Sequence, residues 1–302
     1  MQDPAAAARP ALFPGASPRR SGSGPARVRV VAPAGPVDPE ALEAGLAVLR
    51  GRGLEVIEGL HARCRTGYLA GDDAERLADL QEALDDPTAD VVWFARGGYG
   101  TTRLLTRLRW DPERPSKTVA GYSDATALHL WGRRFPNLRS LYAPSVTELG
   151  RPGVVVFDSL WAALENNPLP VPGRGPAESH GPFPVAGGCL SLCVASAGTP
   201  WAPDTGGCWV FFEEVGEALY RVDRALTHLA HAGWFDRAAG LLLGGFTDLG
   251  GGETPADVEA RARELLPLGT PLVTALPVGH LSGKHTLPLG RPARWDGRSL
   301  RF

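Results

Sequence analysis

The chain has 302 residues, 43% hydrophobic and 21% charged, so it can form two domains of ordinary size and has the composition of a globular protein. Its formal net charge of −2 gives no electrostatic reason to expect a nucleic acid or an acidic membrane surface as a partner. No stretch approaches the roughly 20 apolar residues that a membrane-spanning helix needs.

The N-terminal segment and the cysteines both bear on the location of the protein. The first 26 residues are rich in Ala, Pro, Arg, Ser and Gly, without the apolar core of a secretory signal, and predict a disordered extension over residues 1–26. The cysteines form no C-x-x-C pair and are not spaced for zinc. We expect buried free thiols, which are typical of a reducing compartment, and therefore a cytoplasmic location. These cysteines are Cys64, Cys189, Cys193 and Cys208.

From residue 27 onward, strand-like and helical patterns alternate. Short apolar runs predict strands at residues 27–31, 54–57, 90–94 and 118–121. Apolar residues at helical spacing predict helices at 39–50, 74–84, 101–108 and 124–133. This alternation favours a parallel sheet covered on both faces, with functional residues at the carboxyl ends of its strands. We assign it to an N-terminal domain over residues 27–150.

The composition of the sequence changes after residue 150. Prolines and glycines predict an interdomain linker over residues 151–185, interrupted by one short helix near 156–164. A second domain is expected over residues 186–302. Its patterns predict helices at 190–197, 217–230 and 255–265, strands at 209–212, 241–243 and 272–276, and short strands from residue 286 onward.

The strand at 118–121 ends in the run Gly-Tyr-Ser-Asp-Ala, which presents Ser123 at a strand-to-helix turn. Such a turn pushes a hydroxyl out of the sheet and directs the following backbone N–H groups towards an oxyanion. The run fits G-x-S-x-A rather than the G-x-S-x-G of a nucleophile elbow, and a lone serine at a turn is more often a helix cap. The turn alone therefore leaves both interpretations open.

Two further strand ends carry groups that would complete a nucleophilic site. Glu213 and Glu214 directly follow the apolar strand at 209–212, and His280 lies in a Gly/Pro loop after the strand at 272–276. Each has an ordinary alternative, since the acidic pair would favour the start of a helix and the histidine would be an exposed loop residue. Together with Ser123 they would supply the nucleophile, the orienting carboxylate and the base.

Other candidate residues give weaker indications of a functional site. The glycine-rich run at 96–100 fits neither G-x-G-x-x-G nor G-x-x-x-x-G-K-[ST], which weakens a nucleotide-binding interpretation. Close approach to a substrate carbonyl, with one backbone N–H in an oxyanion hole, suits these glycines better. His228 and His231 share a predicted helix without a third ligand, so we expect no metal site, and we expect His129 to be structural.

In several of these runs the chain resembles the LD-carboxypeptidase family of serine peptidases. The matching runs are 30–35, 95–105, 121–128, 187–192, 211–217, 220–226, 276–280 and 286–290, and they occur in order with compatible spacing. The resemblance implies an N-terminal Rossmann-like parallel-sheet domain and a smaller C-terminal α/β domain, with the active site between them. It also implies a homodimer, the common state of the family.

The resemblance also implies a Ser–His–Glu triad without a metal or other cofactor. Ser123 is then the nucleophile, His280 the general base, and Glu213 the carboxylate that orients the histidine. Glu214 is the second choice for the carboxylate. The implied oxyanion-hole donors are the backbone N–H groups of Asp124 and of Gly98 or Gly97.

The activity that the family implies is hydrolysis of an L,D-peptide bond through an acyl-enzyme. It releases the terminal D-alanine from murein tetrapeptides during cell-wall recycling. The alternative is a second branch of the family, which hydrolyses peptide–nucleotide antibiotics of the microcin C type. A catalytically silent binding protein is a third candidate, and the presence of all three triad residues argues against it.

Three departures from the family pattern leave the triad intact. Cys189 stands where the family has Asn, His285 stands near another usual Asn, and Tyr142-Ala143-Pro144 replaces His-Gly-Pro. Because polar groups near a site orient the ligand, these departures bear on the choice of substrate rather than on the chemistry.

Overall fold

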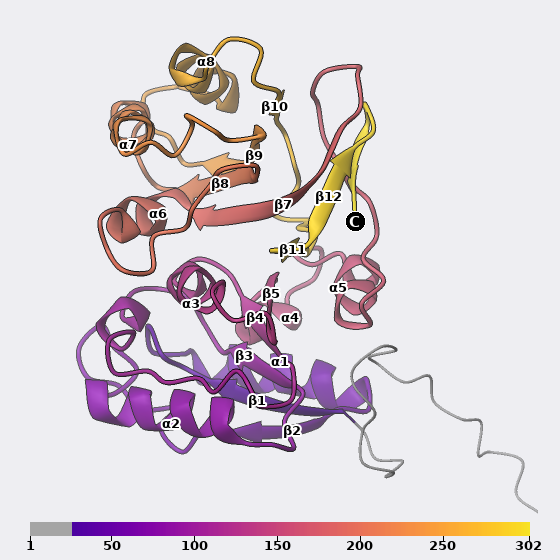
Figure 1. Cartoon of the computed structure of the whole chain (residues 1–302). Coiled ribbons are helices and arrows are strands. Elements are labelled where there is room, and N and C mark those ends of the chain that lie inside the picture. Colours follow the sequence, from indigo (N-terminus) through magenta and orange to yellow (C-terminus); the bar gives the residue numbers. More distant parts are fainter. Residues whose placement is uncertain (1–25) are drawn as a thin grey trace, which may run out of the picture.

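The computed structural model describes residues 26–302, so the extension predicted over residues 1–26 lies, except for Ala26, outside the described residues. The described chain contains one sheet of six strands and one of seven. In Figure 1 the first sheet, mostly indigo to magenta, lies below the second, which runs from pink to yellow. None of the helices in this part of the chain is long and apolar enough to cross a membrane.

The first sheet comes mainly from the N-terminal half of the chain. Its strands are β1 (Arg27–Val31), β2 (Glu55–Glu58), β3 (Val91–Phe94), β4 (Lys117–Gly121), β5 (Leu138–Tyr142) and β11 (Leu287–Leu289). They lie in the order β11-β5-β4-β3-β1-β2, and every neighbouring pair is parallel except β11 with β5. The central strands β3 and β4 are buried along their whole length, as a parallel sheet covered on both faces requires.

Helices cover both faces of this sheet, which confirms the layering predicted from the sequence (Figure 1). Those on one face are α1 (Pro39–Gly51), α4 (Val146–Leu149) and α5 (Phe157–Leu164), and those on the other are α2 (Asp73–Asp85) and α3 (Ala125–Gly132). The segment 101–108, predicted as a helix, contains only the 3₁₀ turn η1 (Thr101–Arg103), closed by a bond from Leu104 N–H to the Thr101 carbonyl.

The second sheet comes from the C-terminal half of the chain. Its strands are β6 (Val171–Pro172), β7 (His180–Cys189), β8 (Trp209–Val215), β9 (Gly240–Thr247), β10 (Leu272–Val273), β12 (Pro292–Trp295) and β13 (Ser299–Arg301). They lie in the order β10-β9-β8-β7-β12-β13-β6, with β7 to β10 parallel and the other pairs antiparallel. Apolar side chains of α6 (Leu190–Ser196), α7 (Leu219–His231) and α8 (Pro255–Leu265) cover one face.

The segment 151–185, which the sequence predicts as a linker, carries regular structure. It contains α5, β6 and the first half of β7. Residues 180–184 of β7 pair with β12, and residues 185–189 pair with β8. Pro182 and Pro184 therefore lie where β7 has a paired strand on one side, which suits a residue without a backbone N–H. The domain boundaries at residues 150 and 186 stay a prediction.

The chain returns to the first sheet near its C-terminus. After the loop that holds His280, β11 pairs with β5, with Leu287 opposite Tyr142. The sequence pattern does not predict β5, because Arg139 and Ser140 interrupt its apolar residues. This return places the His280 loop at the junction of the two sheets, beside the carboxyl end of β4.

Candidate active site

The candidate nucleophile lies at the predicted strand-to-helix turn. The strand β4 ends at Gly121, α3 begins at Ala125, and the half-buried Ser123 between them has a φ of +61°. A non-glycine residue in this left-handed region stores strain, and turns that present nucleophiles are often strained. The backbone N–H of Asp124 makes no hydrogen bond within residues 26–302, so it is available to an oxyanion.

The glycine-rich loop after β3 lies directly against this serine. A Cβ added to Gly97 would stand 2.9 Å from Ser123 Oγ, so a side chain at position 97 would collide with the nucleophile. Gly98 has a φ of +114°, which only glycine adopts without strain. In the described part of the chain, the N–H groups of Gly97 and Gly98 are not hydrogen-bonded. The loop and the turn therefore meet with free donors, as the predicted oxyanion hole requires.

The side chain of Asp124 has a different role from its backbone N–H. It is fully buried, and its Oδ2 accepts the N–H of Thr101 at 2.8 Å. Burial raises the pKa of the Asp124 carboxyl, and the bond from Thr101 opposes that rise. This contact fixes η1, at the end of the glycine-rich loop, to the start of α3.

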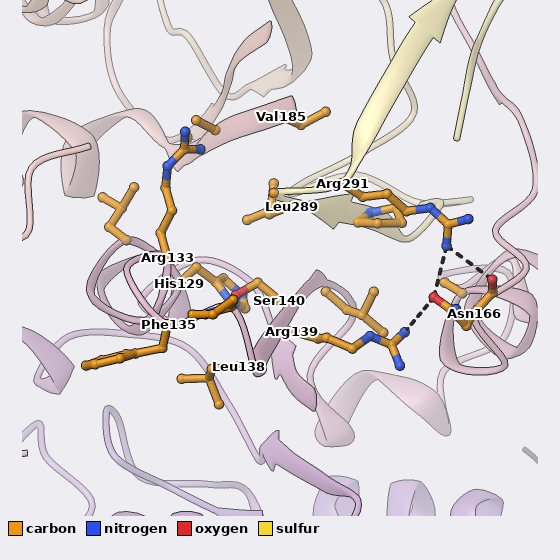
Figure 2. A pocket seen from close by; sticks show the side chains of 18 residues that line it. His129, Arg133, Phe135, Leu138, Arg139, Ser140, Asn166, Val185, Leu289 and Arg291 are labelled. Carbon is orange, nitrogen blue, oxygen red and sulfur yellow. Dashed lines mark hydrogen bonds between the residues drawn. The ribbon is translucent and has the colours of Figure 1, made fainter. Parts of the chain in front are cut away.

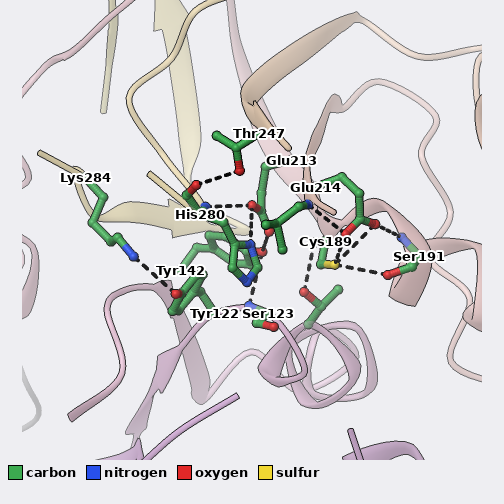
Figure 3. A network of polar contacts seen from close by, with 12 residues as sticks. Tyr122, Ser123, Tyr142, Cys189, Ser191, Glu213, Glu214, Thr247, His280 and Lys284 are labelled. Atoms are coloured by element: carbon green, nitrogen blue, oxygen red, sulfur yellow. Dashed lines mark hydrogen bonds and ion pairs between the residues drawn. The ribbon is translucent and has the colours of Figure 1, made fainter. Parts of the chain in front are cut away.

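Glu213 and His280 form a direct pair (Figure 3). Glu213 Oε2 lies 2.8 Å from His280 Nδ1 and accepts the backbone N–H of His280 at 2.9 Å. Glu213 is fully buried, whereas the His280 side chain keeps 19% of its surface exposed. Because an ionised carboxylate only accepts hydrogen bonds, Nδ1 carries the proton and Nε2 is left for a second partner.

The residue before His280 must be a glycine for this pair to form. Gly279 has a φ of +108°, and a Cβ there would stand 2.3 Å from Glu213 Oε2. In the motif Val-Gly-His at 278–280, the glycine thus gives the backbone the shape that lets both the N–H and the ring of His280 reach the buried carboxylate.

Ser123 and His280 face each other across the junction of the two units (Figure 3). Among residues 26–302, the Ser123 hydroxyl is not hydrogen-bonded to the imidazole. The ring of Tyr122, the residue before Ser123, packs on the His280 ring with their centroids 4.6 Å apart. Catalytic hydrogen bonds commonly tighten when substrate binds, so this open geometry is compatible with a nucleophile–base pair.

Tyr142 connects the two parts of the site. Its hydroxyl donates to Glu213 Oε1 at 2.5 Å and accepts the N–H of Ser123 at 3.3 Å. Burial, and then the charge of Glu213, raise the pKa of this phenol, so it stays protonated and able to donate. The sequence marks Tyr142 only as a departure from the family pattern, and its link to Ser123 and Glu213 was not predicted.

Glu214, the second choice for the orienting carboxylate, points away from His280. Its Oε2 accepts the N–H of Ser191 at 2.8 Å, in the first turn of α6, and the Cys189 thiol lies 3.5 Å from its Oε1. Successive side chains of a strand point to opposite faces, so β8 presents only one glutamate to the histidine. The structure brings Glu213 to His280, as the first choice from the sequence predicts.

The other polar candidates lie apart from this pair. His129 is buried with Nε2 2.9 Å from the Gly121 carbonyl, and burial lowers the pKa of this histidine to about 4. No group of three His, Cys, Asp or Glu side chains within residues 26–302 could hold a metal ion, and His228 and His231 lie on α7. The four cysteines are free; Cys64 is half-buried and the other three are buried.

A second buried network, which was not predicted, lies beside the site. Lys284 Nζ donates to Glu148 Oε1 at 2.6 Å, and the Tyr122 hydroxyl donates to the same oxygen at 2.8 Å. Burial alone would raise the pKa of Glu148, but the charge of Lys284 brings it below its ordinary value. The chain has lysine only at positions 117 and 284, and this scarcity is the one sequence signal that could have drawn attention to Lys284.

The fold and this grouping of Ser, His and Glu between two α/β units indicate a hydrolytic enzyme. Models of the LD-carboxypeptidase N-terminal domain and the LD-carboxypeptidase C-terminal domain match residues 28–143 and 184–295. The chain therefore belongs to the LD-carboxypeptidase family, as its motifs predict. Membership makes it a hydrolase of the carboxypeptidase type.

Relatives and solved structures agree with this assignment. A Streptomyces coelicolor protein assigned to the carboxypeptidases is 38% identical over 90% of this chain and 90% of its own length. The murein tetrapeptide carboxypeptidase of Pseudomonas aeruginosa is 31% identical over 91% of this chain and 95% of its own. The crystal structure of muramoyltetrapeptide carboxypeptidase from Oxalobacter formigenes has a TM-score of 0.78 and 29% identity, covering 91% of this chain and 97% of that one.

A more distant likeness concerns the fold alone. A microcin self immunity protein, solved in complex with aspartyl sulfamoyl adenosine, has a TM-score of 0.78 at 20% identity. It covers 92% of this chain and 95% of its own. These likenesses confirm the predicted two-unit α/β architecture.

Proposed function

We propose that the chain is a serine LD-carboxypeptidase that releases the terminal D-alanine of murein tetrapeptides through a Ser123–His280–Glu213 triad. The observation that carries the proposal is the double contact of Glu213 Oε2 with Nδ1 and the backbone N–H of His280. This contact holds the imidazole in the tautomer that a general base needs. The murein substrate is supported by the names of the Pseudomonas and Oxalobacter relatives.

The proposed reaction begins at the strained turn. Nε2 of His280 removes the proton of the Ser123 hydroxyl as Oγ attacks the carbonyl carbon of the L,D-peptide bond. The carbonyl oxygen becomes an oxyanion, which the N–H groups of Asp124 and of Gly98 or Gly97 stabilise. The carboxylate of Glu213 stabilises the imidazolium that forms.

The intermediate then collapses in two steps. The C–N bond breaks, the amine of D-alanine takes the proton from His280 Nε2, and the acyl group remains on Ser123 Oγ. A water molecule, deprotonated by His280, attacks the ester and releases the shortened peptide with its new carboxylate. Serine and imidazole return to their starting protonation states.

Release of D-alanine tests this proposal. The full chain is given an L,D-linked murein tetrapeptide, and free D-alanine is measured for the wild type, Ser123→Ala and Ser282→Ala. Ser282 is an exposed serine in the same loop as His280, so its removal tests for general effects of losing a hydroxyl. We expect Ser123→Ala to lose at least ~10⁴-fold in kcat and Ser282→Ala to match the wild type. Equal release by wild type and Ser123→Ala would overturn the mechanism.

The alternative substrate is a peptide–nucleotide or aminoacyl–nucleotide conjugate, cleaved by the same residues. The microcin self immunity protein shares the fold. In this chain Cys189 stands at one position, and the half-buried His285 near another, where the family usually has Asn, and such differences bear on the choice of substrate. The same assay therefore includes an aminoacyl–sulfamoyl adenosine. Faster cleavage of this compound than of the murein peptide would favour the alternative, with Ser123→Ala inactive on both.

A cytoplasmic location and a homodimer complete the proposal. The location is supported by four free cysteines, which suit a reducing compartment. The dimer rests on the family resemblance. Light scattering coupled to gel filtration measures the mass directly, and a single species of about 32 kDa would contradict the dimer.

A further inference from the structure

A cavity of about 410 Å³ lies at the junction of the two sheets, apart from the triad. Its walls come from α3, β5, β7 and the loop that follows β11, and the end of α5 closes one side (Figure 2). Neither Ser123, Glu213 nor His280 lines it. The cavity is therefore a separate place from the candidate active site.

The lining of this cavity is cationic. It includes Arg133, Arg139 and Arg291, and it includes no acidic side chain. Within residues 26–302, none of these three arginines forms an ion pair with a carboxylate. Arg133 directs its Nη2 to the Asp204 carbonyl and Cys208 Sγ, so Arg139 and Arg291 are the two that face each other. Two neighbouring guanidinium groups without a counter-charge are unfavourable unless an anion offsets them.

Two of the arginines converge on one neutral oxygen. Arg139 Nη2 donates to Asn166 Oδ1 at 3.2 Å, and Arg291 Nη1 donates to the same oxygen at 2.9 Å (Figure 2). Both arginines are half-buried. The shared acceptor brings the two charges close together, and burial, followed by the charge of Arg291, lowers the pKa of Arg139. Arg291 Nη1 also donates to the backbone carbonyl of Asn166 at 3.1 Å. These two oxygens of one residue leave most of the donors of both guanidinium groups unused.

The cavity also borders unpartnered polar atoms of α3 and of Arg133, the residue that directly follows this helix. Nη1 of Arg133 and Nδ1 of His129 are buried and have no hydrogen-bond partner in the described part of the chain. Nε2 of His129 lies on the Gly121 carbonyl, so the neutral ring donates there and keeps Nδ1 as a bare acceptor. A ligand in the cavity would therefore contact the helix that begins at the Ser123 turn.

We propose that this cavity binds a small anion through a phosphate or carboxylate group held between Arg139 and Arg291. Guanidinium groups bind such groups through paired N–H donors, and a dianion would relieve the repulsion between the two arginines. The site is distinct from the triad, and its occupation does not require that the chain hydrolyse murein peptides.

Calorimetric titration with inorganic phosphate at low ionic strength tests the site in the full chain. The variants are Arg139→Met, Arg291→Met and the control Arg107→Met, which removes the same charge from an exposed arginine that does not line the cavity. We expect one phosphate per chain for the wild type and for Arg107→Met. Each cavity variant should weaken binding at least tenfold, and added salt should weaken it in the wild type.

A second measurement needs no variant and covers the case in which a cavity variant fails to fold. Hydrogen exchange of the wild type is followed by mass spectrometry with and without phosphate. We expect slower exchange in peptides that cover residues 138–142 and 287–291. Absence of saturable binding would overturn the proposal. So would equal loss of affinity in Arg107→Met, or protection confined to other segments.

Discussion

Two buried networks at the junction of the sheets are built from the same parts. Each joins a glutamate of one unit to a tyrosine hydroxyl and to a nitrogen of the segment 280–284. The first consists of Glu213, Tyr142 and His280, and the second of Glu148, Tyr122 and Lys284. They touch through Tyr122, whose ring lies 4.6 Å from the His280 ring and 4.3 Å from the Lys284 ammonium.

The difference between the networks lies in the nitrogen. An imidazole can take and give a proton near neutral pH, whereas an ammonium keeps its proton. His280 has 19% of its side chain exposed beside Ser123, while Lys284 has 4% exposed and is closed off. The same carboxylate–tyrosine arrangement can therefore support proton transfer in one place and join two units in the other. Substitutions that leave shape unchanged should separate these roles.

The largest effect should come from Glu213→Gln. Gln keeps the size of the side chain but cannot stabilise an imidazolium, so we expect kcat to fall about 10³- to 10⁴-fold with a small change in melting temperature. Glu148→Gln should do the reverse, lowering the melting temperature by several degrees and kcat less than tenfold. D-alanine release and thermal unfolding measure both. Equal losses of kcat in the two variants would contradict the proposed difference between the two networks.

Glu214→Gln is the matched control for that change. Glu214 is also buried in β8, but its oxygens meet the N–H groups of Ser191 and Val215 instead of a histidine. We expect Glu214→Gln to retain kcat within about tenfold. A loss as large as that of Glu213→Gln would reassign the orienting carboxylate.

Local sequence patterns predicted the strands β3 and β4, which lead to the glycine-rich loop and to Ser123. They failed for strands whose surroundings change from residue to residue. The apolar runs of β3 and β4 are buried on both faces, so their sequences show the strands directly. β5 carries Arg139 and Ser140 towards a cavity, and β7 exchanges one neighbouring strand for another along its length. Tertiary surroundings decide such segments, so their local pattern is weak.

The candidate site shows the same division. Ser123 and His280 follow strands, as the sequence predicts, whereas Glu213 and Glu214 lie inside β8, which runs to Val215 and so extends beyond the strand predicted at 209–212. The choice between the two glutamates depends on which face of β8 meets the histidine. No local pattern contains that information. Tyr142 and Lys284 act through partners 71 and 136 residues away in the chain, so their contacts emerge only when the sheets are assembled.

An intermediate effect is expected for Lys284→Met, which leaves Glu148 buried without its cation. Breaking a buried ion pair from one side costs about 3–5 kcal/mol of unfolding free energy. The double variant Glu148→Leu/Lys284→Met should recover most of that loss, because two apolar side chains replace the pair. Chemical denaturation of the three proteins measures the difference. No recovery in the double variant would show that the pair itself does not carry the stability.

The pH dependence of that loss has a definite sign. The pKa of Glu148 is lowered in the folded chain from its ordinary value of 4.5, so its stabilising contribution is complete above that value. It disappears as the pH falls through the folded pKa, since Glu148 is then protonated in both states. The gap in unfolding free energy between wild type and Lys284→Met should therefore be largest near pH 7 and shrink below about pH 4.5.

The smallest effect, and the one that most directly compares the networks, should come from the two tyrosines. Tyr142→Phe removes the donor to Glu213 and the acceptor of the Ser123 N–H, so we expect kcat to fall about tenfold with KM little changed. Tyr122→Phe keeps the ring that packs on His280 and removes two hydrogen bonds, one to Glu148 and one from Lys284, while Lys284 still neutralises Glu148. It should cost about 1 kcal/mol of stability and leave kcat unchanged. If Tyr142→Phe altered stability alone, Tyr142 would join the sheets without positioning the triad.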